Sequence, residues 1–465
     1  MYVRISIWCI LVLAVSVEAM SHALLVKEIE ISGHHRTKEL TILRELDFTI
    51  GDTILLSELT QRLDRNRANL LNTALFTEAE LNIKEWDHDA LQIVVSISVK
   101  EAWYLYIIPI VELADRNFNV WWQEHHRAFN RLNLGVSAYH INLTGVRDRL
   151  KVKGQVGYTP KFEIHYQLPY FNREKSLGIT TNALWSSNKE VAYITRGNKL
   201  EFYKNDKNPA FRRFRLQAGL RYRPNLYMMH DLDLAFYSNC IDPIIAFDNN
   251  PDFFLHQKTR QHYFALRYKS VYDNRDLQLF PMKGIVGGIE VHKEGLGSFD
   301  DVNSLSITGF VEYHYPVLKN VSVGVMTKGQ YGVIRKKQPF WNYQGLGFGN
   351  DYIRGYELYV INGMDYVYGK ASVITRLINS SINWKRKMPK AFREMPLQFY
   401  VTLNYDIGHV NDPFFAAGNP LVNRTLSGGG PGLALVLSHT FALQAEYSFN
   451  ELGENGLFLH TKTSF

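Results

Sequence analysis

The sequence predicts a mainly β protein: a large transmembrane antiparallel β-barrel of about sixteen strands, preceded by one small α/β domain. The chain is rich in aromatic residues, with 27 Tyr, 27 Phe and 8 Trp, yet its mean hydropathy of -0.20 is that of a polar chain. After Trp103, segments of about ten residues alternate between apolar and polar side chains, as tilted membrane strands do. No segment after the N-terminus approaches about 18 uninterrupted apolar residues, so strands are the expected membrane spans.

Residues 1–23 are expected to form a cleaved signal peptide. Arg4 supplies a short positive start, and the apolar run over residues 5–17 is too short to span a bilayer. Small residues follow, which predicts cleavage after Ala19 or Ala23. The alternative is a buried N-terminal helix. Only one cysteine would remain in the mature chain, so no intramolecular disulfide is expected.

Residues 24–101 differ in pattern from the rest and predict the α/β domain. Residues 25–31 alternate as a strand, and Gly33 ends it. Two stretches with leucines at helical spacing follow, and then two further alternating segments. The order strand, helix, helix, strand, strand is sufficient for a small domain of its own.

Residues 102–465 are expected to form the barrel. Two long segments interrupt its alternation: residues 223–258, which hold either one more strand or a long loop, and residues 332–367, which connect two strands. Long loops belong on the extracellular side of such barrels, whereas periplasmic turns are short. The alternative fold, a soluble β-sandwich, needs a sharper apolar inner face and does not usually reach this length.

Several motifs resemble the BamA-like outer-membrane-protein assembly superfamily, in which POTRA domains precede a barrel of the bacterial surface antigen type. The ordered set VKEIEISGHHRTKELTILRELDFTIGDTI, LLNTALFTEAELNI and LQIVVSISVKE resembles one POTRA domain. In the barrel, LPYFN (168–172) and YDNRDLQLFPMKG (272–284) are similar to strand-end and strand-turn-strand patterns of the family. The resemblance covers the chain from about residue 24 to its end.

The segment GFGNDYIRGYE resembles the loop-six motif of this superfamily, which centres on an Arg-Gly-aromatic triplet. In the family this loop folds back into the barrel. Arginine offers five donors in a fixed arrangement and can hold a carboxylate through two of them, and glycines let the backbone lie against a wall. The candidate loop residues are Gly347, Gly349, Arg354, Gly355 and Tyr356.

The partner of the loop arginine in the family is an acidic residue within an aromatic-x-Asp-x-Gly pattern on a nearby strand. The stretch NYDIGHV is similar to that pattern and supplies Asp406 and Gly408. Asn404 stands where the family has the aromatic residue. The resemblance therefore implies a contact between Arg354 and Asp406.

The two ends of the barrel sequence suggest a weak seam. Phe465 ends the chain with an aromatic residue, as bacterial barrel proteins commonly do. Pro109 cannot donate to a strand ladder and belongs on an edge or at a strand end. The resemblance implies a lateral gate between the first and last strands. Here these strands are residues 103–111 and residues 456–465, and the last strand begins at Gly456. Alternatively, Pro109 only ends the linker that follows the first domain.

No catalytic or metal-binding pattern stands out. The chain contains no HExxH, cysteine-based metal spacing, P-loop or Gly-x-Ser-x-Gly segment. A net charge of +7 without a long Lys/Arg run does not favour a nucleic-acid-binding protein. We therefore expect a protein that is not an enzyme and has neither a metal nor a cofactor.

The resemblance implies a protein of the bacterial outer membrane with its POTRA domain in the periplasm. It would assist the insertion of other β-barrel proteins, the POTRA domain capturing them and the seam inserting them. Expected partners are the outer-membrane lipid bilayer, unfolded outer-membrane or secreted client polypeptides, and accessory assembly subunits. The alternatives are a two-partner secretion pore, which usually has two POTRA domains and a plug helix, and a scaffold paralogue without insertion activity.

Overall fold

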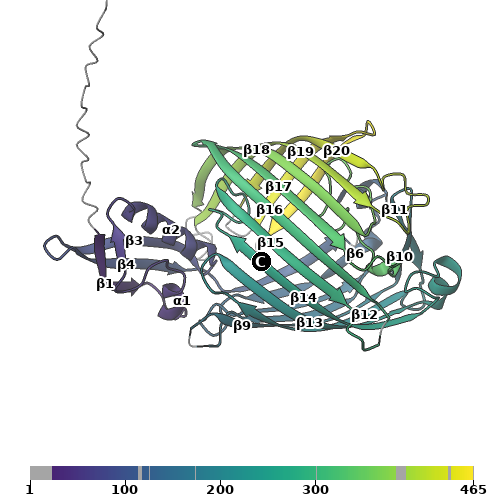
Figure 1. Cartoon of the computed structure of the whole chain (residues 1–465), viewed down its shortest axis with the longest axis horizontal. Helices are drawn as coiled ribbons and strands as arrows, with labels where there is room; N and C mark the ends of the chain where they lie inside the picture. Colours follow the sequence, from purple (N-terminus) through teal and green to yellow (C-terminus); the bar gives the residue numbers. More distant parts are fainter. Residues whose placement is uncertain are drawn as a thin grey trace, which may run out of the picture.

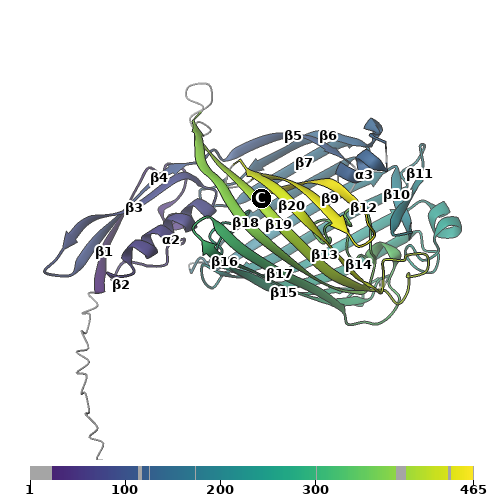
Figure 2. The same ribbon diagram turned by 90° about the horizontal axis from the view of Figure 1, so that it is seen from above.

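The structure is a computed structural model that describes residues 23–113, 118–124, 126–172, 174–299, 301–383, 394–437 and 441–463. A small α/β domain lies at one end of a long barrel (Figures 1 and 2). Phe465 and, apart from Ala23, the predicted signal peptide lie outside the described residues. In these ranges no helix combines the length and apolar character that a membrane crossing needs.

The N-terminal domain is a four-stranded sheet with two helices. Its strands pair in the order β2-β1-β4-β3, and only β1 and β4 run parallel. The elements are β1 (Ala23–Ser32), α1 (Glu39–Leu43), β2 (Thr53–Leu55), α2 (Leu59–Asn72), β3 (Phe76–Asp87) and β4 (Gln92–Glu101).

One continuous apolar core joins these helices to the sheet. Ile42 of α1 and Leu70 of α2 are fully buried with Leu24 and Val95 of the strands. The sequence pattern predicts two helices and three strands. The structure adds the three-residue strand β2, which is too short to show a periodic pattern and forms by pairing with the start of β1.

In the part of the chain that the structure describes, sixteen strands form the barrel sheet, and neighbouring strands pair antiparallel. The prediction of an antiparallel barrel with about sixteen strands is confirmed. The strands are β5 (Leu105–Leu113), β6 (Leu132–His140), β7 (Arg149–Gly157), β8 (Lys161–Leu168), β9 (Leu177–Asn188), β12 (Phe211–Tyr222), β13 (Met228–Ile241), β14 (Arg260–Asp273), β15 (Gly284–Glu294), β16 (Ser304–Leu318), β17 (Val321–Gly332), β18 (Asp365–Asn383), β19 (Glu394–Asn411), β20 (Thr425–Val436), β21 (Phe441–Asn450) and β22 (Asn455–Thr463).

The alternation expected of a membrane barrel is visible along β12. Leu216 and Leu220 are exposed on the outer face. Arg215 and Arg221, which alternate with them, are half-buried and pair with polar groups of neighbouring strands. The undecided segment 223–258 resolves into strand β13 followed by a loop that contains a π-helical turn, η2 (Ile245–Asn249).

The end of the barrel away from the N-terminal domain is covered by loops. A hairpin of β10 (Glu190–Arg196) and β11 (Lys199–Lys204) lies there (Figure 1). The hairpin, the η2 turn and the short helix η3 (Phe340–Asn342) share an apolar cluster around Phe253 and Phe254. The loops at this end therefore have a core of their own.

The first and last strands, β5 and β22, are the two edges of the barrel sheet. Among the described residues, no backbone pairing joins β5 to β22. A short helix in the β5–β6 connection, α3 (Phe118–Gln123), contacts β22, and the Asn119 amide donates to the carbonyl of Leu457. Helix α3 is not among the elements predicted from the sequence.

Candidate functional site

The connection between β17 and β18, residues 333–364, lies against the inner wall of the barrel. On β19, Tyr405 and Ile407 are exposed on the outside, so Asp406 between them faces the lumen and is fully buried. On β21, Glu446 is fully buried in the same way beside exposed Tyr447. These two carboxylates form the part of the wall that the loop contacts.

Arg354 joins the loop to both carboxylates. Its Nη1 lies 2.5 Å from Asp406 Oδ1, and its Nε donates to Glu446 Oε1 at 2.8 Å. Its backbone N–H also donates to Asp406 Oδ2 at 3.1 Å. Lys370 Nζ, on β18, lies 3.5 Å from the same Asp406 oxygen. We call Arg354, Asp406, Glu446 and Lys370 the arginine clamp.

The clamp is buried, which decides how strongly it holds the loop. Charge-assisted hydrogen bonds are stronger than neutral ones, and removing one partner of a buried pair leaves an uncompensated charge. The sequence motifs point to Arg354 and Asp406 but not to Glu446. Glu446 lies in a strand without a recognisable motif, and only the pairing of β20 with β21 brings it beside the loop.

Two glycines of the motif let the loop and the wall approach closely. Gly355 has φ +84°, and a Cβ on it would lie 2.8 Å from the carbonyl oxygen of Phe449 on β21. A Cβ on Gly408 of β19 would lie 2.7 Å from Ile353 Cδ1. Both positions therefore exclude a side chain.

The other predicted loop residues lie in the same segment. Tyr356 is 2% exposed and packs in an apolar cluster with Ile353 and Leu426. Gly347 and Gly349 line a cavity of about 730 Å³ between the loop and strands β19 to β22. The structure thus brings all five loop residues to one wall of the barrel.

Asn404 stands at the position of the family's aromatic residue and makes polar contacts there. It faces the lumen two residues before Asp406, and its amide donates to Thr402 Oγ1 at 2.9 Å and to Glu446 Oε1 at 3.3 Å. Its own oxygen accepts from Ser372 at 2.8 Å. Where the family has an aromatic residue, this chain has a polar link between β18 and β21.

The seam residues lie on the two sheet edges. Pro109 stands within β5, opposite Val136 of β6, and is exposed. Gly456 stands at the start of β22, opposite Ser448 of β21. Among the described residues, no backbone pairing joins the strands of Pro109 and Gly456, and Phe465 falls outside those residues.

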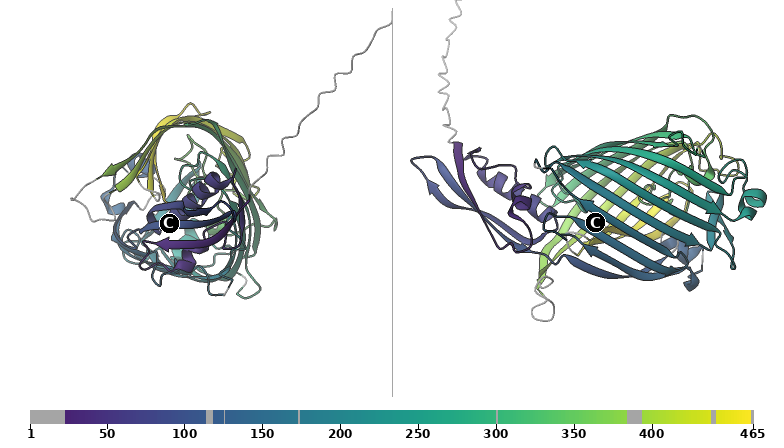
Figure 3. Two further views of the ribbon diagram at one scale, coloured as in Figure 1. Left: turned by 90° about the vertical axis from the view of Figure 1, so that its left-hand side faces the viewer. Right: turned by 90° about the horizontal axis from the view of Figure 1, so that it is seen from below.

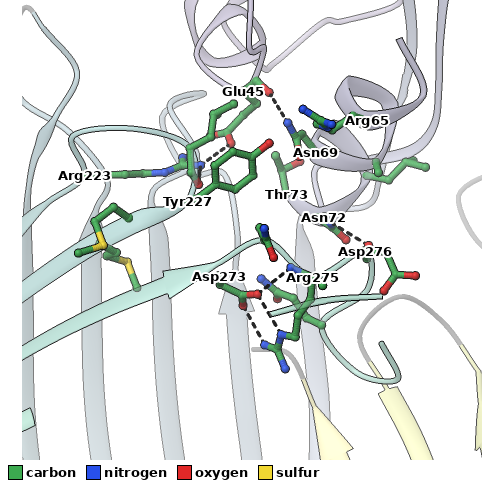
Figure 4. A pocket seen from close by; sticks show the side chains of 18 of the residues that line it. Glu45, Arg65, Asn69, Asn72, Thr73, Arg223, Tyr227, Asp273, Arg275 and Asp276 are labelled. Carbon is green, nitrogen blue, oxygen red and sulfur yellow. Dashed lines mark hydrogen bonds and ion pairs between the residues drawn. The ribbon is translucent and has the colours of Figure 1, made fainter. Parts of the chain in front are cut away.

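A second charged centre lies between the N-terminal domain and the barrel (Figure 4). Glu45, just after α1, is 3% exposed. Arg223 at the end of β12 donates to both of its oxygens at 2.8 and 3.0 Å. Arg147 Nη1, before β7, lies 3.3 Å from the carboxylate. Burial alone would raise the pKa of Glu45, but Arg223 and Arg147 outweigh it and lower this pKa to about 2.

Further contacts surround this ion pair. Thr41 of α1 donates to the carbonyl of Gly145 at 3.1 Å, and the Asn72 amide, at the end of α2, donates to the carbonyl of Asp276 at 3.4 Å. A cavity of about 800 Å³ separates α2 from the turns of the barrel between these contacts. Sequence reasoning missed this centre, because its residues share no local motif.

Comparisons with known proteins agree with this architecture. BamA from Haemophilus ducreyi lacking POTRA domains 1–3 is 15% identical, with a TM-score of 0.53 over 95% of this chain and 84% of that chain. CdiB from Escherichia coli is 13% identical, with a TM-score of 0.56 over 94% of this chain and 75% of that chain. At these identities the likeness concerns the fold. Among curated proteins, no match is found.

A family model supplies the assignment. The Omp85 superfamily domain matches residues 142–450, more than half of the chain. This match spans most of the barrel and includes Arg354, Asp406 and Glu446. The expected relationship to the BamA-like superfamily is thereby confirmed: the chain belongs to the Omp85 superfamily.

Proposed function

We propose that this protein assists the insertion of β-barrel proteins into the outer membrane, at the edges formed by β5 and β22. One observation carries the proposal: within the described residues, each of these strands pairs on one side only. An unpaired edge presents a row of N–H and C=O groups that another strand can join. Pro109 removes one donor from the β5 edge and favours a ladder that opens.

We further propose that residues 24–101 are a single POTRA domain, placed in the periplasm, that receives the client. Its sheet has two edge strands, β2 and β3, of three and twelve residues. The length of β3 suits the addition of an extended client segment. Seen along the barrel axis, the domain lies in front of the barrel end (Figure 3), so a segment captured on β3 would be held next to the barrel.

The arginine clamp supports insertion at the seam rather than passage through the lumen. It holds residues 333–364 against the inner wall of β18 to β21, next to β22. A loop fixed in this way supports the last strands from the inside while a client strand pairs with the edge of β22 and later leaves it.

A disulfide lock tests the seam directly. Ile107 of β5 and Leu459 of β22 are both exposed on the outer face. In a Cys240→Ser background, Ile107→Cys with Leu459→Cys should reduce client insertion into liposomes when oxidised and restore it when reduced. The matched control is Ala445→Cys with Leu459→Cys, which links strands that are already paired in register. Full insertion activity in the oxidised seam variant would refute the proposal.

Depletion of the protein from its bacterium separates the alternatives. Broad loss of barrel proteins from the outer membrane supports insertion. Loss of a single secreted polypeptide supports a two-partner secretion pore. An unchanged outer membrane and an unchanged set of secreted proteins support a scaffold role and contradict both insertion and secretion.

A further inference from the structure

A cluster of metal-ligating side chains lies beside the arginine clamp, where three distant parts of the chain meet. Glu357 follows the Arg-Gly-Tyr triplet of the loop, Glu446 is on β21 and His460 is on β22. One candidate ligand atom from each lies within 4.8 Å of the others. His460 Nε2 is 3.5 Å from Glu446 Oε2 and 3.9 Å from Glu357 Oε1.

These separations fit a common metal ion. Zinc binds nitrogen and carboxylate oxygen at about 2.0–2.2 Å, so two ligand atoms at a tetrahedral angle are about 3.4 Å apart. The separations of 3.5 and 3.9 Å are close to this value, and the two carboxylate oxygens lie within 4.8 Å of each other, so small side-chain rotations would bring all three atoms to ligating distances. Glu357 and Glu446 are 3% and 0% exposed, so the group is enclosed by protein.

The surroundings hold Glu446 and His460 in a ligating orientation. Three donors converge on Glu446 Oε1, from Arg354 at 2.8 Å, Gln444 at 2.6 Å and Asn404 at 3.3 Å. They fix the carboxylate so that its other oxygen is directed to His460. The His460 ring is stacked on Tyr352, with centroids 5.0 Å apart and planes at 9°. Outer contacts of this kind orient metal ligands and raise affinity.

The charge in this part of the lumen also favours a cation. Asp406, Glu446 and Glu357 bring three acidic side chains together, whereas Arg354 and Lys370 supply two basic ones. Burying an excess carboxylate is costly, and a divalent ion offsets that cost.

The neighbouring cavity of about 730 Å³ provides access for the ion. Glu357 and His460 both line it, so an ion can enter from it and a water molecule can complete the coordination. Three protein ligands with one open position is an arrangement that zinc accepts. One imidazole nitrogen with two carboxylates selects zinc over magnesium or calcium, which prefer oxygen ligands alone.

We propose that Glu357, Glu446 and His460 bind one divalent transition-metal ion, zinc in the first place, which ties the lumen loop to the last strand. This site could not be predicted from the sequence, because its residues lie in three separate segments. They become neighbours only through the loop and the pairing of β21 with β22. The site is independent of the proposed insertion function, and its test does not measure insertion.

The test uses the folded full-length chain in detergent, freed of metal with EDTA. Titration calorimetry with Zn²⁺ should give one saturable site per chain, and Zn²⁺ should raise the unfolding temperature, because a ligand that binds the folded state stabilises it. His460→Gln and Glu357→Gln should each weaken binding at least about tenfold. His165→Gln is the matched control, since His165 lies on β8 outside the cluster, and it should bind zinc as the wild type does.

Heat-modifiable migration in electrophoresis verifies that each variant is folded, and Glu357→Gln, which changes a loop, serves if His460→Gln fails to fold. Absence of saturable zinc binding would overturn the site, as would equal affinities in the wild type and the folded cluster variants.

Discussion

Asp406 holds Arg354 twice: one of its oxygens accepts from the Arg354 backbone N–H at 3.1 Å, and the other lies 2.5 Å from the Arg354 Nη1. A single carboxylate thus fixes both the backbone and the side chain of the loop. The guanidinium then reaches Glu446 through a different nitrogen, Nε. The two carboxylates lie on β19 and β21, so one arginine spans three strands of the wall.

Arg354→Lys should weaken the clamp although the charge is kept. Lysine has one nitrogen and cannot reproduce the fixed Nη1 and Nε contacts to two carboxylates. A loss on the order of 3 kcal/mol in the free energy of unfolding is expected, with faster proteolysis of residues 333–364. Guanidinium unfolding in detergent measures the first effect. Arg424→Lys is the control, because the Arg424–Glu451 pair is exposed and 3.9 Å long; equal losses in both variants would contradict a special role for the clamp.

Gly355→Ala should detach the loop from β21. The residue has φ +84°, and an added Cβ would lie 2.8 Å from the Phe449 carbonyl oxygen. The backbone strain costs about 1–3 kcal/mol, and the contact adds to it. Gly349→Ala is the comparison, since Gly349 has φ +55° but open space around its Cβ position. If both substitutions destabilise the protein equally, the close contact with Phe449 has no energetic weight.

Only part of the arginine clamp could be predicted from the sequence. Arg354 and Asp406 stand in local motifs, which can be recognised in a single sequence. Glu446 and His460 are neighbours of the loop only through the register of β20, β21 and β22. Alternation predicts that such residues face a lumen, yet it does not predict which strand lies opposite which loop. The same reason applies to the pair of Glu45 and Arg223.

Acid should release the N-terminal domain from the barrel at an unusually low pH. Arg223 and Arg147 lower the pKa of Glu45 to about 2 from an ordinary value of 4.5. The carboxylate therefore contributes fully to docking above about pH 4.5, and this contribution is lost as the pH falls through about 2. Hydrogen exchange of the α1 backbone between pH 6 and pH 2 follows the release.

Two variants test the assignment of this transition to Glu45. Glu45→Gln should expose α1 at neutral pH, because it removes the charge that Arg223 and Arg147 hold. Arg223→Ala should move the release to higher pH, since the burial that raises the pKa of Glu45 remains while its main counter-charge is lost. Glu78→Gln, which breaks an exposed pair with Lys100 inside the domain, is the control. An unchanged release in Arg223→Ala would assign the transition to another group.

Restoring the family's aromatic residue at position 404 should destabilise this barrel. Asn404 is 5% exposed and faces the lumen, where its amide donates to Glu446 and its oxygen accepts from Ser372. In Asn404→Phe, both contacts are lost and a larger ring meets the buried carboxylate of Glu446, which costs on the order of 1–3 kcal/mol. Tyr405→Phe is the control, because Tyr405 is exposed on the outer face. Guanidinium unfolding of both variants measures the difference; a gain in stability for Asn404→Phe would mean that the polar link between β18 and β21 can be replaced by packing alone.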